Sequence, residues 1–264
     1  MVSYRRFVAI WKKGILMVQN KDMVYGFRPV IEAIKSGKTF DKLFVQKTLS
    51  GELATEFHEA VKSNKVIITK VPPEKLNRFT RKNHQGVVGF ISPIEFANID
   101  HIVDQCFAEG RDALLLVLDR ITDVRNFGAI VRTAECSGVD AIIVPSRGAA
   151  QISGDAMKTS SGALNLVPIC RTNNLVALLK SLQQSGLSLI ACTEKTDTTL
   201  YEVTYTQPSI IIMGSEDTGI SSEIMSFCDF KAKIPMTGKI QSLNVSTSTG
   251  IILYEAIRQR NFNS

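Results

Sequence analysis

The chain has 264 residues, of which 44% are hydrophobic, and it carries a formal net charge of +6. This length suggests one or two domains with a sizeable core. No apolar run reaches the ~18 residues of a membrane-spanning helix, so we expect no membrane partner. Five scattered cysteines without a Cys-x-x-Cys pair argue against a disulfide framework and a zinc site. We therefore expect a reducing, cytoplasmic location and no bound metal.

The first 22 residues resemble a secretory signal only loosely. Basic residues precede apolar ones, but Lys12, Lys13 and Gly14 interrupt the apolar run, and no small-residue cleavage site is clear. We interpret residues 1–22 as a disordered leader, or as sequence upstream of a true start at Met17 or Met23.

Short helices and strands alternate over residues 23–96. A helix is predicted from Pro29 to Gly37, with proline early and glycine at its end. Residues 1–98 contain 17 Lys and Arg against 8 Asp and Glu, whereas residues 99–264 contain 14 against 17. A basic part joined to a mildly acidic part suggests that the first binds a polyanion, although a lysine-rich solvated surface is the plainer alternative. The further predicted elements of this small α/β domain are strands at 42–46, 65–69 and 86–91 and helices at 52–63 and 73–79.

Residues 97–112 are polar with a weak helical pattern, and we interpret them as a linker to a second domain, residues 113–264. This domain opens on a continuous apolar run, 113–119, which is typical of a strand buried on both faces of a parallel sheet. The alternation that follows predicts an open, mostly parallel sheet with helices on both faces, and hence an α/β fold. Further strands are predicted at 141–145, 188–192, 209–214 and 231–234, and helices at 127–138, 153–160, 174–185 and 221–227.

Polar and glycine-rich segments follow three of these strands. In the first, Asn126 is a candidate N-cap, while Arg125 and Arg132 are seven residues apart and project from one side of the predicted helix. Two guanidinium groups beside a helix start suit a phosphodiester. An ordinary capped helix with exposed arginines explains the same pattern.

The second segment, 211–220, places Gly214 and Gly219 around Glu216; the glycines permit a turn and a close approach of a ligand to the backbone. In the third segment, 234–246, Ser242 or Asn244 can cap the last helix. Because the carboxyl ends of parallel strands line one crevice, we expect the three segments to form a pocket.

Taken together, the three segments resemble the motifs of the SpoU-type RNA 2′-O-ribose methyltransferases of the SPOUT group. The resemblance covers residues 113–260. The N-terminal part is similar to that family's small RNA-binding domain through Tyr25-Gly26 and His84-Gln85-Gly86-Val87. The residues that carry the resemblance in the second domain are Asn126, Gly128, Ile130, Arg132 and Ala134 in motif one; Met213-Gly214-x-Glu216-x-x-Gly219 in motif two; and Ile234-Pro235-Met236 with residues 242–246 in motif three.

This resemblance implies a deeply knotted trefoil fold, S-adenosylmethionine as the methyl donor without a metal, and a homodimer formed through the C-terminal helix. The family's proposed base corresponds to Arg132. Since arginine stays protonated, we expect it instead to grip the phosphate and stabilise the developing alkoxide. The implied catalytic residues are Arg132, Asn126, Glu216, Ser242 and Asn244, and the implied cofactor-binding residues are Met213, Gly214, Gly219, Ile234, Met236 and Leu243.

The predicted activity is therefore methyl transfer to a ribose 2′-hydroxyl, most similar to the branch that modifies a guanosine of large-subunit (23S) ribosomal RNA. Two alternatives stay open, namely the same chemistry on transfer RNA and a non-catalytic RNA-binding or ribosome-assembly protein. The residues expected to contact RNA are Arg28, Arg81, Lys82, His84, Gln85 and Arg125.

Overall fold

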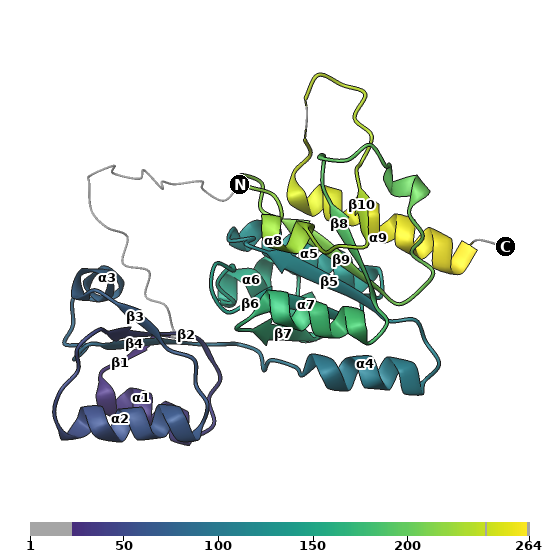
Figure 1. Cartoon of the computed structure of the whole chain (residues 1–264). Helices are drawn as coiled ribbons and strands as arrows, with labels where there is room; N and C mark the ends of the chain where they lie inside the picture. Colours follow the sequence, from purple (N-terminus) through teal and green to yellow (C-terminus); the bar gives the residue numbers. More distant parts are fainter. Residues whose placement is uncertain (1–22, 241, 263–264) are drawn as a thin grey trace, which may run out of the picture. The chain divides into compact units, whose positions relative to one another are not determined.

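The computed structural model describes residues 23–240 and 242–262, so the predicted leader lies outside the described residues. The chain divides into two compact units between Ile91 and Ser92. Figure 1 shows the course of the chain through both units. Each unit has a β-sheet of its own.

The first unit is a four-stranded mixed sheet with the order β1-β4-β2-β3. Strand β4 pairs antiparallel with β1 and β2, and β3 pairs parallel with β2. The elements are β1 (Met23–Tyr25), α1 (Phe27–Lys35), β2 (Phe40–Gln46), α2 (Glu52–Ser63), β3 (Thr69–Val71), α3 (Pro73–Phe79) and β4 (Val87–Ile91).

Two separate apolar clusters fill the two faces of this sheet. One packs α1 and α2 against residues such as Leu43 and Val87, and the other packs α3 against Phe44 and Phe90. Figure 1 shows α1 and α2 on one side of the sheet and α3 on the other. The face beneath α3 is thus covered by one helix of seven residues.

The second unit is a fully parallel six-stranded sheet with the order β10-β8-β9-β5-β6-β7. From β5 the chain builds outward through β6 and β7, then crosses to the other side for the last three strands. The elements are α4 (Ile99–Ala108), β5 (Leu114–Asp119), α5 (Val124–Cys136), β6 (Ala141–Pro145), α6 (Gly154–Thr159), η1 (Ala163–Asn165), β7 (Ile169–Thr172), α7 (Leu175–Gln184), β8 (Ser188–Cys192), η2 (Leu200–Glu202), β9 (Ser209–Gly214), α8 (Ser222–Met225), β10 (Phe230–Ala232) and α9 (Val245–Phe262).

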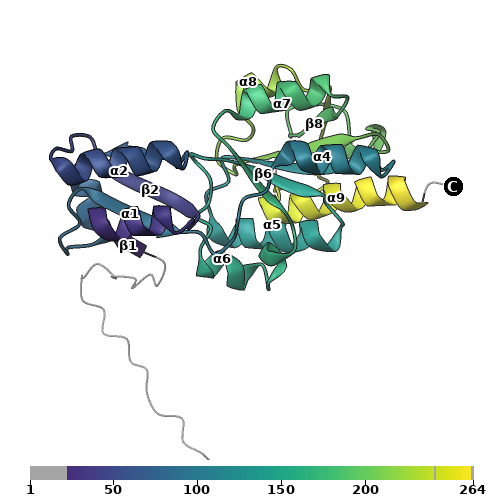
Figure 2. The ribbon, with the colours of Figure 1, turned by 90° about the horizontal axis from the view of Figure 1, so that it is seen from below.

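Helices cover both faces of the large sheet, as predicted. One apolar cluster contains buried residues of α5, α6 and α9, and the other contains buried residues of α4, α7 and α8. Figure 2 shows these two groups of helices on opposite sides of the strands. The continuous apolar runs of the sequence are explained by this arrangement, since all six residues of β5 are buried. The trefoil knot implied by the resemblance stays a prediction.

The interpretation of residues 97–112 as a linker is wrong. They contain α4, which is capped by the Asn98 side chain accepting the Asp100 backbone N–H at 2.9 Å. Ile99, Val103 and Cys106 are buried against the large sheet. Their spacing of four and three residues is the helical periodicity behind the weak pattern in the sequence.

Several element boundaries also differ from the predictions. The strand predicted at 65–69 begins only at Thr69, because Lys65 has a φ of 52° and the Val66 N–H bonds to the Val61 carbonyl to close α2. Strands β1 and β7 are short and were not predicted.

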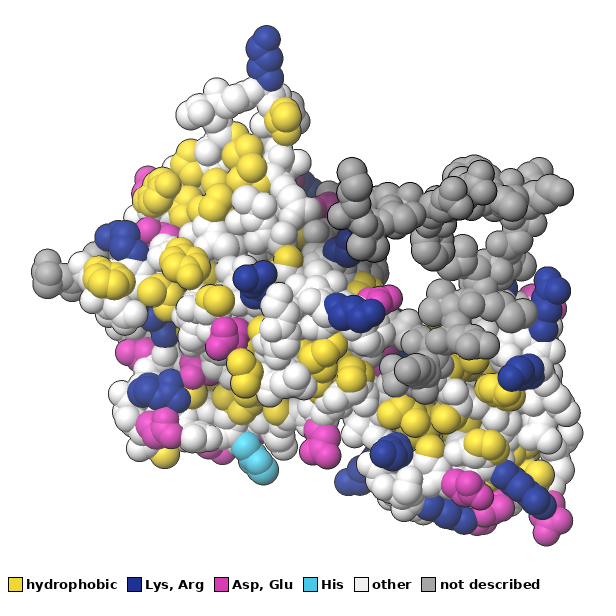
Figure 3. All heavy atoms as spheres, turned by 180° about the vertical axis from the view of Figure 1, so that it is seen from behind, with side chains coloured by type: hydrophobic (Ala, Val, Ile, Leu, Met, Phe, Trp, Pro, Cys, Tyr) yellow, Lys and Arg dark blue, Asp and Glu magenta, His cyan; other side chains and the backbone are white. Residues whose placement is uncertain are grey.

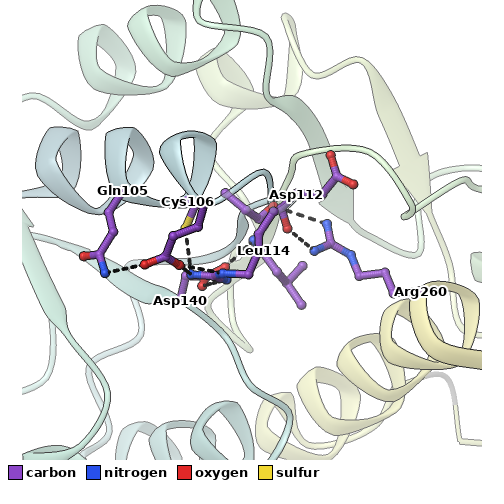
Figure 4. A network of polar contacts seen from close by, with 9 residues as sticks. Gln105, Cys106, Asp112, Leu114, Asp140 and Arg260 are labelled. Carbon is purple, nitrogen blue, oxygen red and sulfur yellow. Dashed lines mark hydrogen bonds and ion pairs between the residues drawn. The ribbon is translucent and has the colours of Figure 1, made fainter.

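Side chains tie together the amino ends of the large sheet's strands (Figure 4). Arg260 of α9 donates to the carbonyls of Asp112 and Ala113 at 2.5 and 3.2 Å. Arg111 pairs with Asp140 at 2.9 Å, and the other oxygen of that carboxylate accepts the Leu114 N–H at 2.8 Å. These bonds stabilise the edge of the sheet where the strands begin. The predicted motifs lie at the opposite edge, at the carboxyl ends of the strands.

Candidate active site

A cavity of about 700 Å³ opens at the carboxyl ends of β8, β9 and β10 and beside the start of α9. This volume falls within the range of roughly 300–1,000 Å³ that is usual for small-molecule sites. Its walls mix apolar side chains with backbone and polar groups. The lining residues are Cys192, Thr193, Glu194, Met213, Gly214, Ser215, Glu216, Gly219, Ala232, Lys233, Ile234, Pro235, Met236, Ser242, Leu243, Asn244, Val245, Ser248 and Ile252.

All six residues predicted to bind the cofactor line this cavity, and so do Glu216, Ser242 and Asn244. Asn126 and Arg132 are outside the lining. The loops after β9 and β10 therefore do meet at one point, as the position of the motifs at strand ends predicts.

Glu216 joins the three motif segments through hydrogen bonds. Its Oε1 accepts from Asn244 Nδ2 at 2.7 Å and from Asn126 Nδ2 at 3.3 Å. Asn244 Nδ2 also donates to Asn126 Oδ1 at 3.0 Å. The carboxylate and two amides thus form a closed triangle of side chains from α5, the β9 loop and the segment before α9.

The same residues cap α9. Asn244 Oδ1 accepts the Ser246 N–H at 2.9 Å, and Glu216 Oε1 accepts the Val245 N–H at 3.1 Å. Free N–H groups at a helix start need such acceptors and favour a negative charge. The predicted capping by Asn244 is confirmed, and it fixes the orientation of the amide that meets Glu216.

The turn after β9 requires glycine at its first position. A Cβ on Gly214 would lie 2.2 Å from both the Gly219 carbonyl carbon and the Ile220 nitrogen, a distance at which backbone atoms must move. Gly219 itself has a φ of 64°, which side chains disfavour. Within the turn, the Gly219 N–H bonds to the Ser215 carbonyl at 2.9 Å. The loop that carries Glu216 is thus tightly folded on itself.

Two residues that the sequence analysis did not assign hold this loop from the neighbouring strand. Asp119 is buried at the end of β5, and its Oδ2 accepts the Ser221 N–H at 2.7 Å. Arg120 has a φ of 60° and donates from Nη2 to the Gly219 carbonyl at 3.0 Å. The signal in the sequence is their position at the end of a buried strand: Asp119 is the last residue of β5 and Arg120 follows it, and β5 pairs with β9 along its whole length.

The prediction that Asn126 caps α5 is wrong. Asp123 Oδ1 accepts the N–H groups of Arg125 and Asn126 at 2.7 and 2.9 Å, so the helix begins at Val124. An aspartate is as good an N-cap as an asparagine. This earlier start leaves the Asn126 side chain for Glu216 and Asn244.

Arg125 and Arg132 are exposed on α5. Among the residues that the structure describes, neither guanidinium takes part in a hydrogen bond or an ion pair, so neither Asn126 nor Glu216 orients Arg132 through a direct bond. Gly128 is buried three residues after Arg125 and four before Arg132, on the neighbouring part of the helix surface, where a Cβ would approach Thr159 Cβ to 2.5 Å. The glycine of motif one therefore allows α5 to pack closely on α6.

In the first unit, Arg28, Arg81 and Lys82 are exposed, as an RNA contact requires. His84 and Gln85 are used within the fold. Gln85 Oε1 accepts the Phe27 N–H at 3.0 Å at the start of α1, and His84 Nδ1 accepts the Gly86 N–H at 3.0 Å. These bonds give both residues a structural role in the turn before β4.

The cavity holds one thiol, that of Cys192. Burial raises the pKa of this thiol, and Cys228 adds to the shift. It therefore stays protonated and acts as a small neutral wall residue. Within the described part of the chain, no three His, Cys, Asp or Glu residues lie together as a metal site would need.

Known proteins share the two units and the motifs described above. The SpoU rRNA Methylase family profile covers residues 113–254, and the profile named RNA 2′-O ribose methyltransferase substrate binding covers residues 23–97. A protein of Staphylococcus saprophyticus, whose name places it in the TrmH family of tRNA/rRNA methyltransferases, is 35% identical over 91% of this chain and 96% of its own. A Bacillus subtilis protein of the same family name, YacO, is 32% identical over 93% of this chain and 98% of its own.

Solved structures of SpoU-type enzymes superimpose on this chain as well. The SpoU methyltransferase AviRb from Streptomyces viridochromogenes, crystallised in complex with the cofactor AdoMet, superimposes with a TM-score of 0.57 at 26% identity over 90% of each chain. The TrmH/SpoU tRNA modifying enzyme of A. aeolicus gives a TM-score of 0.52 at 36% identity over 57% of this chain and 76% of its own.

The fold, the pocket and the three joined motifs thus define an RNA methyltransferase. The chain belongs to the SpoU rRNA methylase family.

Proposed function

We propose that this protein transfers a methyl group from S-adenosylmethionine to a ribose 2′-hydroxyl of RNA, at a guanosine of large-subunit ribosomal RNA. The observation that carries the proposal is the bonded triangle of Asn126, Glu216 and Asn244, of which the last two line the cavity. Three segments of chain converge there, and each belongs to a different motif.

The cavity fits the proposed donor. Apolar walls at Met213, Ile234, Leu243 and Ile252 suit an adenine ring. Gly214 leaves backbone groups bare for hydrogen bonds to a polar ligand. When bound, the donor supplies a methyl group on a positively charged sulfur that is a good leaving group. The cavity residues would hold and orient the donor, and much of the acceleration would come from this positioning.

The remaining residues act on the RNA in this proposal. Asn126 and Glu216 would bond the target ribose, and Ser242 and Asn244 would contact substrate or donor. Arg132, whose guanidinium is exposed and free of described partners, would grip the phosphate next to the ribose. A fixed positive charge there favours the alkoxide that forms as the hydroxyl loses its proton.

We further infer a homodimer formed through α9. One side of this helix is buried in the core, yet Ile251 and Ile257 are only half-buried and Tyr254 is 54% exposed. Figure 3 shows hydrophobic side chains gathered over part of one face of the second unit. A dimeric mass in multi-angle light scattering is expected.

The proposal places ribosomal before transfer RNA because the chain carries a unit that matches the substrate-binding profile, whereas the A. aeolicus tRNA modifying enzyme matches 57% of this chain. The test incubates the protein with methyl-labelled donor and either unmodified large-subunit rRNA or total unmodified tRNA. Digestion and mass spectrometry should find 2′-O-methylguanosine in the rRNA alone. Label in tRNA would show that the protein performs the same chemistry on the alternative substrate. Absence of both label and donor binding would favour a non-catalytic RNA-binding protein.

A further inference from the structure

Charge is unevenly distributed over the first unit. Helices α1 and α2 together carry four acidic and three basic side chains, and Lys35 pairs with Glu56 at 2.7 Å. Figure 3 shows the two kinds of charge intermixed over part of this unit. In contrast, residues 75–82 hold four basic side chains and no acidic one. We call this segment the α3 ridge; its basic residues are Lys75, Arg78, Arg81 and Lys82.

All four basic side chains of the α3 ridge are exposed. Within the described ranges 23–240 and 242–262, none of them forms an ion pair or a side-chain hydrogen bond. Lys75 Nζ lies 5.3 Å from the centroid of the Phe44 ring. Glu74 is the one acidic side chain of α3, against these four basic ones, and in the described part of the chain it forms no ion pair with them. Exposed cations that are not held in ion pairs attract a polyanion.

The ridge is held in a fixed shape by the aromatic cluster beneath it. Phe79 stacks on Phe44 with centroids 4.9 Å apart and meets Phe90 edge-on at 5.2 Å. Leu76 is fully buried against the same cluster. A rigid backbone lets the basic side chains bind without the cost of ordering a loop.

The turn that follows α3 is locked as well. His84 Nε2 bonds Asn77 Oδ1 at 3.0 Å, and because His84 Nδ1 accepts the Gly86 N–H, the proton of the neutral ring lies on Nε2. The Lys82 N–H bonds the Thr80 hydroxyl at 3.2 Å. His84 therefore holds the turn that follows the ridge.

We propose that the α3 ridge is the surface of the first unit that binds the phosphate backbone of the RNA substrate, while the α1–α2 layer faces away from it. The proposal rests on the proposed function for the choice of RNA as partner. It adds the element that makes the contact, and it removes Arg28, which lies on α1, together with His84 and Gln85 from the contact set. Each bound phosphate releases counterions, so the ridge should govern the salt dependence of binding.

The test compares two fourfold variants of the full chain with equal loss of charge. The ridge variant carries Lys75→Gln, Arg78→Gln, Arg81→Gln and Lys82→Gln; the control carries Lys35→Gln, Lys38→Gln, Lys62→Gln and Lys65→Gln. Filter binding to unmodified large-subunit rRNA transcript is measured between 50 and 200 mM salt. Circular dichroism and donor titration check folding. If the ridge variant does not fold, the double variants Lys75→Gln/Arg78→Gln and Arg81→Gln/Lys82→Gln replace it.

For the ridge variant we expect affinity to fall at least 100-fold near 0.1 M salt and the log–log salt slope to decrease by about 2 or more, at roughly 0.7–0.9 per lost phosphate contact. The control should weaken less than tenfold. Equal weakening of both variants, or wild-type affinity of the ridge variant, would overturn the proposal. Wild-type protein that binds rRNA through the ridge but transfers no methyl group would instead refute the proposed function alone.

Discussion

At the scale of single residues, Glu216 is the point where distant parts of the chain meet. Its carboxylate accepts hydrogen bonds from groups 28, 29 and 90 residues away in the sequence. It is also exposed toward the cavity that it lines. One side chain thereby couples the cap of α9 to the predicted ribose contact.

We expect Glu216→Gln to lower the rate of methyl transfer about 10- to 100-fold. The amide keeps the shape but loses the charge, and hydrogen bonds to a charged group are worth about 1.5–3 kcal/mol. Single-turnover assays with rRNA measure the effect, and Glu223→Gln, which removes an exposed carboxylate of α8, is the matched control. Equal rates of methyl transfer in both variants would show that the charge of Glu216 does not contribute to the reaction.

Gly214→Ala should weaken donor binding at least tenfold, because the added Cβ collides with backbone atoms 2.2 Å away and opens the loop. Isothermal titration calorimetry provides the measurement. Gly154→Ala adds the same methyl group at the start of α6, where no atom lies within 4 Å, and should bind normally. Unchanged affinity in Gly214→Ala would place the donor elsewhere.

Arg132→Lys tests the proposed phosphate grip. Lysine keeps the charge but loses the planar fork of donors. We expect rRNA affinity to stay within a few-fold of wild type and methyl transfer to fall at least ~10²-fold, which corresponds to a few kcal/mol of barrier. Near-normal turnover would exclude a catalytic role for this arginine.

At the scale of elements, α9 links the pocket to the base of the sheet. Its first turn is capped by the motif residues, and its last turn reaches the amino ends of the strands through Arg260 (Figure 4). Between them, Gln259 accepts the Tyr205 N–H at 3.0 Å and donates to Glu255 at 2.9 Å. The position of the pocket wall thus depends on polar contacts along the whole helix.

Glu255 should make stability depend on pH. Hydrogen bonds from Arg258 hold its pKa below the ordinary value, and its side chain is only 6% exposed. A lowered pKa in the folded state stabilises the fold above the unfolded value, and this contribution is lost as pH falls through the folded value. We expect wild type to melt several degrees above Glu255→Gln at pH 7, with the difference closing below about pH 4.

Thermal melts from pH 7 to pH 3 measure this difference. Glu223→Gln serves again as the control and should leave the melting temperature within about one degree at every pH. A constant gap between wild type and Glu255→Gln over the whole range would show that the charge of Glu255 does not stabilise the fold.

At the scale of the whole molecule, the sequence predicts the parallel sheet and the convergence of the loops after β9 and β10. Continuous apolar strands and polar strand ends are local signals, and parallel strands place their carboxyl ends together. The role of Asn126 was predicted less well, because capping by Asp123 or Asn126 satisfies the same local rule. Only tertiary contacts with Glu216 and Asn244 decide between them.

Other features of the fold are not predicted from the sequence for similar reasons. The helix at Ile99–Ala108 is difficult to recognise in the sequence, because only three of its residues are buried and the stretch is otherwise polar. Asp119 and Arg120 act through backbone atoms about 100 residues away, at Ser221 and Gly219, and no spacing rule connects such positions. Local patterns thus locate the motifs, but the bonds between the motifs need the folded chain.

The measurement that tests the central claim most directly is an experimental structure of the protein with S-adenosylhomocysteine and a fragment of its RNA substrate. We expect the ligand between the loops at Gly214, Ile234 and Leu243, with a ribose 2′-oxygen beside Asn126 and Glu216. A ligand bound on another face of the second unit, or a base rather than a ribose placed at those side chains, would contradict the account.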